Sequence, residues 1–228
     1  MSQHLCRLLE RNGRILFERE SLDIHGKLEP KDDRTYQIYL RTDNPDISNL
    51  QVELGFIKEA LREFQSRLPY NIKVFSTLPY PLTLADVDVT IDFIEPDSYM
   101  TGNVLAWGGY PNGSLRGQMK LNNKYTWLDG FNKTGYELSM LGISLPGMTD
   151  AGVYQTYNTR QTVKHEFGHV LGLDHDTEPL SVMGAIYHVL NLMFSLVSLQ
   201  ALDNKYGLRS VSSRFLNYMK LRIQRKHF

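Results

Sequence analysis

The sequence predicts an α+β domain, because strand-like segments alternate with helical ones along the chain. Three segments have the residue pattern of strands: TYQIYLRT at 35–42, NIKVFST at 71–77 and ADVDVTIDF at 85–93. Between the first two, Leu50–Leu68 carries apolar residues at intervals of three and four, which predicts an amphipathic helix ending before Pro69. Strands and helices in this order favour a sheet covered by helices.

The run HEFGHVLGLDHD at 165–176 carries the strongest functional signal in the chain. His165 and His169 stand four residues apart and therefore share one face of a helix, where two imidazoles can bind one zinc ion. Glu166 follows the first histidine and can act as a general base. Gly172 lets the helix stop, and His175 then returns as a third ligand. Three protein ligands with an open fourth position predict a catalytic zinc site with one Zn²⁺ ion.

This run resembles the signature of the metzincin zinc metallopeptidases, in which a methionine-containing turn follows the third histidine. Met183 stands eight residues after His175, an interval that looks like that of the matrix metalloproteinase (matrixin) catalytic domain. The resemblance covers about residues 35–207. It implies a zincin-like fold with a twisted, mostly parallel sheet, an antiparallel edge strand, a long active-site helix, a Met-turn beneath the ligands and a C-terminal helix.

Two further segments are similar to matrixin segments. Residues 102–130 resemble the stretch from the glycine-rich loop through the edge strand to a tryptophan, which makes Arg116–Leu121 the expected edge strand and the partner of an extended substrate. FSLVSLQALDNKYG at 194–207 resembles the last helix of the family.

The implied activity is that of a zinc metalloendopeptidase, in which a zinc-activated water attacks the peptide bond and Glu166 takes its proton. The implied partner is a protein or peptide substrate. Because Leu180, Ile186 and Val189 are apolar, we expect a hydrophobic residue just after the cut bond. The alternative is a catalytically weak or inactive metzincin-like zinc-binding interaction protein, although retention of Glu166 argues against it.

The sequence departs from the matrixin pattern at a second, structural zinc site, which the family builds from three histidines and an aspartate. No histidine lies between positions 26 and 164, and Trp107 stands where the family has a ligand. We therefore expect one zinc, no obligatory calcium, and an edge region held by packing around Trp107, Tyr110 and Trp127. Asp176 also departs from the pattern. It either ties the ligand loop to the Met-turn by hydrogen bonds or is a solvated loop acid.

Composition is that of a globular protein, with 42% hydrophobic and 22% charged residues and a formal net charge of zero. We expect a monomer with no nucleic-acid partner and no transmembrane segment. The single cysteine excludes an intramolecular disulfide. No signal peptide is recognisable, so the expected location is the cytoplasm or release by a non-classical route.

Three regions are predicted: an N-terminal extension at 1–33, the catalytic domain at 34–208 and a basic amphipathic C-terminal helix at 209–228. Cys6 is expected either as a small apolar residue on a short helix, Ser2–Arg11, or as a thiolate that holds the zinc latent. The C-terminal helix either packs on its own domain or contacts a partner or an anionic surface.

Overall fold

The computed structural model describes residues 8–11, 14–17, 25–32, 34–41, 50–100, 104–123, 126–128, 156–178, 181–185 and 193–207. Within these ranges, no helix has the length and apolar character needed to cross a membrane. Cys6 and the segment 209–228 lie outside the described residues, as do Leu180, Ile186 and Val189.

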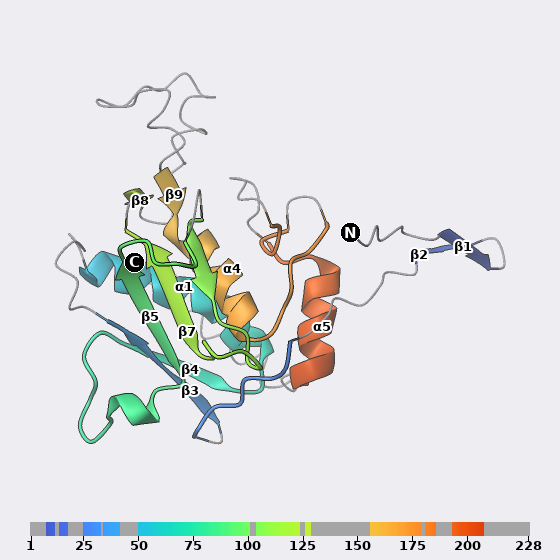
Figure 1. The fold of residues 1–228 in the computed structure, drawn as a ribbon. Coiled ribbons are helices and arrows are strands. Elements are labelled where there is room, and N and C mark those ends of the chain that lie inside the picture. Colours follow the sequence, from blue (N-terminus) through green and yellow to red (C-terminus); the bar gives the residue numbers. More distant parts are fainter. Residues whose placement is uncertain are drawn as a thin grey trace, which may run out of the picture.

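A five-stranded sheet forms the centre of the domain, in the order β4-β3-β5-β7-β6 (Figure 1). Its strands are β3 (Thr35–Leu40), β4 (Asn71–Phe75), β5 (Val89–Ile94), β6 (Ala106–Gly108) and β7 (Gln118–Asn122). The pairs β3–β4, β3–β5 and β5–β7 are parallel, whereas β6 runs antiparallel to β7. The predicted mostly parallel sheet with an antiparallel edge strand is thus confirmed.

The edge strand itself lies elsewhere than predicted. The segment expected at the edge, Arg116–Leu121, corresponds to β7, which pairs with β5 on one side and β6 on the other. The antiparallel edge strand is β6, and its glycine, Gly108, is more typical of a loop than of a strand. A Cβ atom on Gly108 would lie 2.3 Å from the carbonyl oxygen of Glu166, so only glycine lets this strand approach the helix that carries Glu166 so closely.

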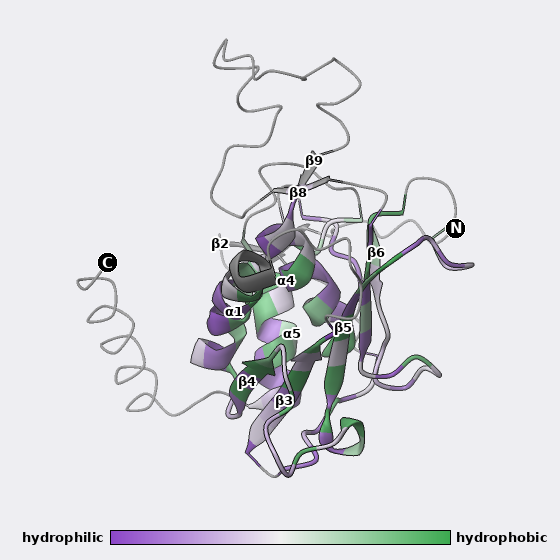
Figure 2. Cartoon of the chain, turned by 90° about the vertical axis from the view of Figure 1, so that its left-hand side faces the viewer, coloured by the Kyte–Doolittle hydropathy of each residue, from purple (hydrophilic) through white to green (hydrophobic). Residues whose placement is uncertain are grey.

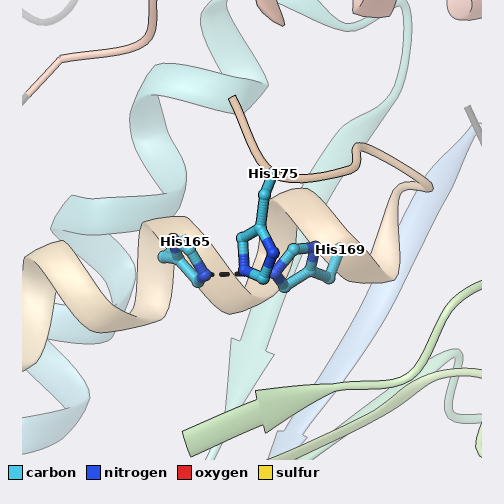
Figure 3. Close-up of side chains that lie close together, drawn as sticks. All are labelled: His165, His169 and His175. Atoms are coloured by element: carbon cyan, nitrogen blue, oxygen red, sulfur yellow. Dashed lines mark hydrogen bonds between the residues drawn. The ribbon is translucent and has the colours of Figure 1, made fainter. Parts of the chain in front are cut away.

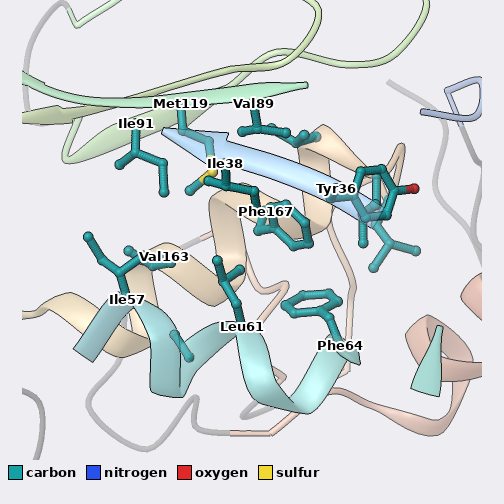
Figure 4. Close-up of a cluster of buried hydrophobic side chains, with 14 of the residues drawn as sticks. Tyr36, Ile38, Ile57, Leu61, Phe64, Val89, Ile91, Met119, Val163 and Phe167 are labelled. Atoms are coloured by element: carbon teal, nitrogen blue, oxygen red, sulfur yellow. The ribbon is translucent and has the colours of Figure 1, made fainter. Parts of the chain in front are cut away.

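Helices α1 (Leu50–Arg67) and α4 (Thr159–Val170) pack on one face of the sheet and against each other (Figure 1). Apolar side chains from both helices meet those of the central strands in one core (Figure 4), and Figure 2 shows hydrophobic residues, in green, on the strands of the sheet and on both helices. The fully buried side chains at its centre include Tyr36, Ile38, Ile57, Leu61, Ile91, Met119 and Phe167. This core fixes the position of α4.

Ion pairs across the helix interfaces add orientation to this packing. Arg160 and Lys164 of α4 lie 2.9 Å from Glu59 and 2.6 Å from Glu63 of α1. At its other end, α1 is joined to α5 (Leu196–Tyr206) by the Arg67 guanidinium, which donates two hydrogen bonds to the Asp203 carboxylate. The helix that the resemblance implies at residues 194–207 is therefore present as α5.

Shorter elements complete the described structure. Strand β8 (Thr126–Leu128) pairs in parallel with β9 (Thr156–Asn158), which leads directly into α4, and a 3₁₀ helix, η1, covers Leu84–Asp86. In the N-terminal extension, β1 (Leu8–Arg11) and β2 (Arg14–Phe17) form an antiparallel pair.

The predicted short helix Ser2–Arg11 is therefore wrong for its last four residues. The register pairs Arg11 with Arg14, so only two residues, Asn12 and Gly13, lie between the strands. An Asn-Gly pair favours the tight turns of two-residue hairpins.

Candidate metal centre

Helix α4 presents two of the three predicted metal ligands. The side chain of Asn158 caps its N-terminus by accepting a hydrogen bond from the Gln161 amide. The chain then reverses after the helix at Gly172, whose φ of 99° favours glycine. This reversal brings His175 back over the helix face that carries His165 and His169 (Figure 3). The potential ligand atoms of the three histidines all lie within 4.8 Å of one another.

Hydrogen bonds to backbone carbonyls set the tautomers of two of these imidazoles. His165 Nδ1 lies 2.7 Å from the Val182 oxygen, and His169 Nδ1 lies 2.8 Å from the Leu173 oxygen. Because a carbonyl only accepts, both Nδ1 atoms must carry the proton, and both Nε2 atoms then carry a lone pair. Carbonyl partners of this kind commonly orient metal-binding histidines.

The two Nε2 atoms lie 3.0 Å apart. Two lone pairs that face each other at this distance repel, whereas a cation between them would be coordinated by both. In a tetrahedral zinc site with Zn–N distances of about 2.0–2.1 Å, ligand nitrogens are separated by roughly 3.3 Å. The donor set and its spacing therefore fit a zinc ion.

Burial keeps these imidazoles neutral and ready to bind a metal. It lowers the pKa of His165 to about 4 and that of His169 to about 3, and it also lowers the pKa of His175. Whereas His169 is buried, His175 is exposed, so the cluster opens to solvent on the side of the returning loop. A substrate or water can reach the metal position from that side.

Glu166 lies in the same helix and is 5% exposed. Burial raises the pKa of its carboxyl to about 8, and a hydrogen bond from the Gly108 amide acts in the opposite direction. The edge strand thus places a backbone amide beside this carboxyl group. A neighbouring cation would favour the carboxylate form.

Met183 lies directly beneath the active-site helix, as the resemblance implies. It is fully buried, and a Cβ atom on Gly168 would lie 2.4 Å from its sulfur. Gly168 lies between His165 and His169, directly before His169, so its missing side chain lets the methionine pack against the turn that carries His169.

Asp176 is 7% exposed and accepts hydrogen bonds from three hydroxyl groups. These come from Ser181 at 3.1 Å, from Ser198 at 2.8 Å and from Ser195, the N-cap of α5. Its backbone amide donates to the Met183 oxygen at 2.8 Å. Of the two alternatives from the sequence, the structure favours the hydrogen-bonded tie between the ligand loop, the Met-turn and α5.

Trp107, which stands where the resemblance implies a structural-zinc ligand, lies opposite a lysine in the neighbouring strand. Trp107 pairs with Lys120 across β6 and β7, and the Lys120 ammonium lies 5.1 Å from the centre of the indole ring. The same ammonium lies 3.5 Å from Asp97, which also accepts a hydrogen bond from the indole nitrogen. This cluster, here called the Lys120 cluster, ties the loop after β5 to the edge hairpin.

The three aromatic residues expected to hold the edge region act at separate places. Trp107 belongs to the Lys120 cluster, together with the ring of Tyr99 at 5.5 Å. Trp127 packs on Phe93 and donates a hydrogen bond to the Asn122 oxygen. Tyr110 contacts the metal-ligand loop instead.

The family model of the matrixins matches residues 28–207. This chain belongs to the matrixin family. A search among curated proteins finds no match to the chain. Matrixins are zinc-dependent metallopeptidases, and the three clustered histidines agree with this chemistry.

Sequence reasoning missed several residues around the centre of this matrixin. Asp174 accepts hydrogen bonds from Tyr110 and His25, and His25 stands far away in sequence, in the predicted extension. The adjacency of Asp174 to His175 was the only local signal. Nothing in the sequence near His25 indicates its place beside the ligand loop.

A cavity of about 970 Å³ in the described part of this matrixin lies away from the histidines. Its lining includes Thr90 and Asp92, which alternate along β5 with the core residues Val89 and Ile91 and therefore face the opposite side of the sheet. The charge of Asp92 is paired there with Arg41 at 3.3 Å.

Proposed function

We propose that this matrixin is a zinc-dependent endopeptidase, with His165, His169 and His175 as ligands of one zinc ion and Glu166 as the general base. The observation that carries the proposal is the pair of Nε2 lone pairs 3.0 Å apart on the helix that also carries the buried carboxyl group of Glu166. A site that only stabilised the fold would need no such carboxyl group.

When bound there, zinc supplies Lewis acidity and lowers the pKa of the attacking water. Glu166 accepts the proton of that water and hands it to the amine that leaves. A pKa near neutrality suits both transfers, because the group must take up a proton and then release it. The burial that raises the pKa of Glu166 therefore supports its role. A bound cation would favour the ionised form of the carboxyl group before water attacks.

An extended substrate is proposed to lie along β6 rather than along Arg116–Leu121. Leu105 and Gly109 use their backbone groups to pair with β7. In an antiparallel strand these groups alternate, so those of Ala106 and Gly108 point to the free edge. Because the Gly108 amide also lies beside Glu166, a peptide paired with this edge would bring its carbonyl group close to the general base.

Hydrolysis of an internally quenched peptide mixture by the zinc-loaded protein tests the proposal. We expect cleavage that a chelator abolishes and that added zinc restores. Glu166→Ala should keep one zinc per chain while losing at least about 10²-fold in rate, the usual size of a general-base effect. The exposed Glu95 provides the control, because Glu95→Gln should cleave like the parent.

Two results would count against the proposal. Cleavage by Glu166→Ala at the parental rate would show that this residue is not the base. Zinc binding without cleavage of any peptide in the mixture would favour the alternative, an inactive metzincin-like zinc-binding interaction protein.

A further inference from the structure

The last residues of the predicted N-terminal extension lie against the end of the active-site helix. The His25 amide donates to the Gly172 oxygen at 2.7 Å, and the Leu28 amide donates to the Tyr206 hydroxyl at 2.9 Å. That hydroxyl in turn donates to the Leu171 oxygen at 2.7 Å. The segment 25–28 is thus bound to the two residues at which α4 ends and the ligand loop begins.

The side chain of His25 reaches Asp174, the residue before the third histidine. His25 Nε2 lies 3.3 Å from Asp174 Oδ2, while the Tyr110 hydroxyl and the His175 amide donate to Oδ1 at 3.3 and 2.7 Å. Burial acts to raise the pKa of Asp174, but these hydrogen bonds outweigh it and lower the pKa below its ordinary value. The carboxylate is therefore held from three directions where the chain enters His175.

Tyr110 also contacts His169, one of the three clustered histidines. Its ring centre lies 5.3 Å from that of His169 in an edge arrangement and 4.3 Å from that of His25. The segment 25–28 passes close to Pro111 and Asn112, and this passage requires glycine at position 26. Gly26 has a φ of 85°, and an added Cβ atom there would lie 3.3 Å from both residues. Tyr110 thus contacts the ring of His169 directly and the backbone of His175 through Asp174.

We propose that Tyr110 and His25 are positioning residues of the metal centre, which hold Asp174 and thereby fix His175 over His165 and His169. The N-terminal segment 25–28 then contributes to zinc affinity although it supplies no ligand. This inference rests on the proposed zinc role of the three histidines. A purely structural role of the two residues would change stability alone.

Zinc affinity measured by competition with a chromophoric chelator separates these roles. Removal of a group that orients a zinc ligand typically weakens binding about 10–100-fold. We expect Tyr110→Phe and His25→Ala to weaken zinc binding about tenfold and to shift the visible absorption of the cobalt-substituted protein. His25→Gln keeps a donor for Asp174 and should restore most of the affinity.

Tyr36→Phe is the matched control. It also removes one tyrosine hydroxyl, which donates to the Leu28 oxygen of the same segment without contacting Asp174. It should lower stability and leave both the zinc affinity and the cobalt spectrum unchanged.

The inference is overturned if Tyr110→Phe and His25→Ala lose stability with unaltered affinity and spectrum. It is also overturned if the parent protein binds no zinc. A parent that binds zinc without cleaving peptides would sink the proposed protease function alone, because every readout here is metal binding or absorption.

Discussion

Removal of the Asp176 carboxylate should lower the free energy of unfolding, because this group joins the loop that carries His175 to the Met-turn and to α5. In Asp176→Ala, the hydroxyls of Ser181, Ser195 and Ser198 lose their common acceptor in a buried place. Each buried polar group left unpaired costs about 1–3 kcal/mol. Ser195 and Ser198 lie 3.3 Å apart and can partly satisfy each other, which leaves a net loss of about 3–5 kcal/mol.

Such a loss is a large share of the free energy of unfolding of a typical domain, which is about 5–15 kcal/mol. Asp176→Asn keeps the volume and one acceptor oxygen, and its amide group can donate to a serine hydroxyl. It should therefore cost only about 1–2 kcal/mol. If Asp176→Ala loses more stability than Asp176→Asn, the hydrogen bonds contribute to stability beyond the volume of the side chain.

The assay is urea unfolding followed by the fluorescence of Trp107 and Trp127, carried out with chelator so that metal binding does not add to the measured free energy. Glu95→Ala, an exposed acid, serves as the control and should change stability by no more than about 0.5 kcal/mol. A similarly small effect of Asp176→Ala would refute the reasoning, because Asp176 would then behave as a solvated loop acid.

Three further outcomes are expected. First, the metal-free Glu166→Ala variant should lose about 2–4 kcal/mol of stability between pH 7 and pH 5, because His165 and His169 have lowered pKa values and bind fewer protons when folded than when unfolded. In the metal-free parent this loss should be smaller, because the raised pKa of Glu166 makes the folded protein bind more protons there and acts with the opposite sign. A flat profile of the variant in urea titrations at each pH would contradict this. Second, elemental analysis should find one zinc per chain, and a count near two would reveal a second site. Lys120→Met should lower the free energy of unfolding by about 1–2 kcal/mol, because the lysine loses its contacts with Trp107 and Asp97. Third, Gly108→Ala should cost at least about 2 kcal/mol in urea unfolding and reduce peptide cleavage, because its Cβ would clash with the Glu166 carbonyl; a stable, fully active variant would show that β6 can retreat without harm.

Much of the fold followed from local patterns. The alternation at 35–42 and 85–93 reflects one buried and one open face, and the structure places β3 and β5 there with Ile38, Val89 and Ile91 fully buried. The edge strand escaped prediction because Gly108 has poor strand propensity. A tertiary contact with Glu166, which no local pattern records, requires glycine at that position.

By itself, the sequence determined which three histidines come together. The spacing of His165 and His169 is tied to the period of a helix, and Gly172 and His175 complete the pattern within a few residues, so that local geometry alone brings these side chains together. Only the tertiary structure decided what holds this group in place. Asp174 contacts His25 and Tyr110, Asp176 contacts the N-terminus of α5, and Lys120 contacts Asp97. The partners in each contact lie far apart in the sequence and are brought together by the packing of the whole domain. Such pairs depend on how sheet and helices stack, and the periodicity of a single segment carries no information about its distant neighbours.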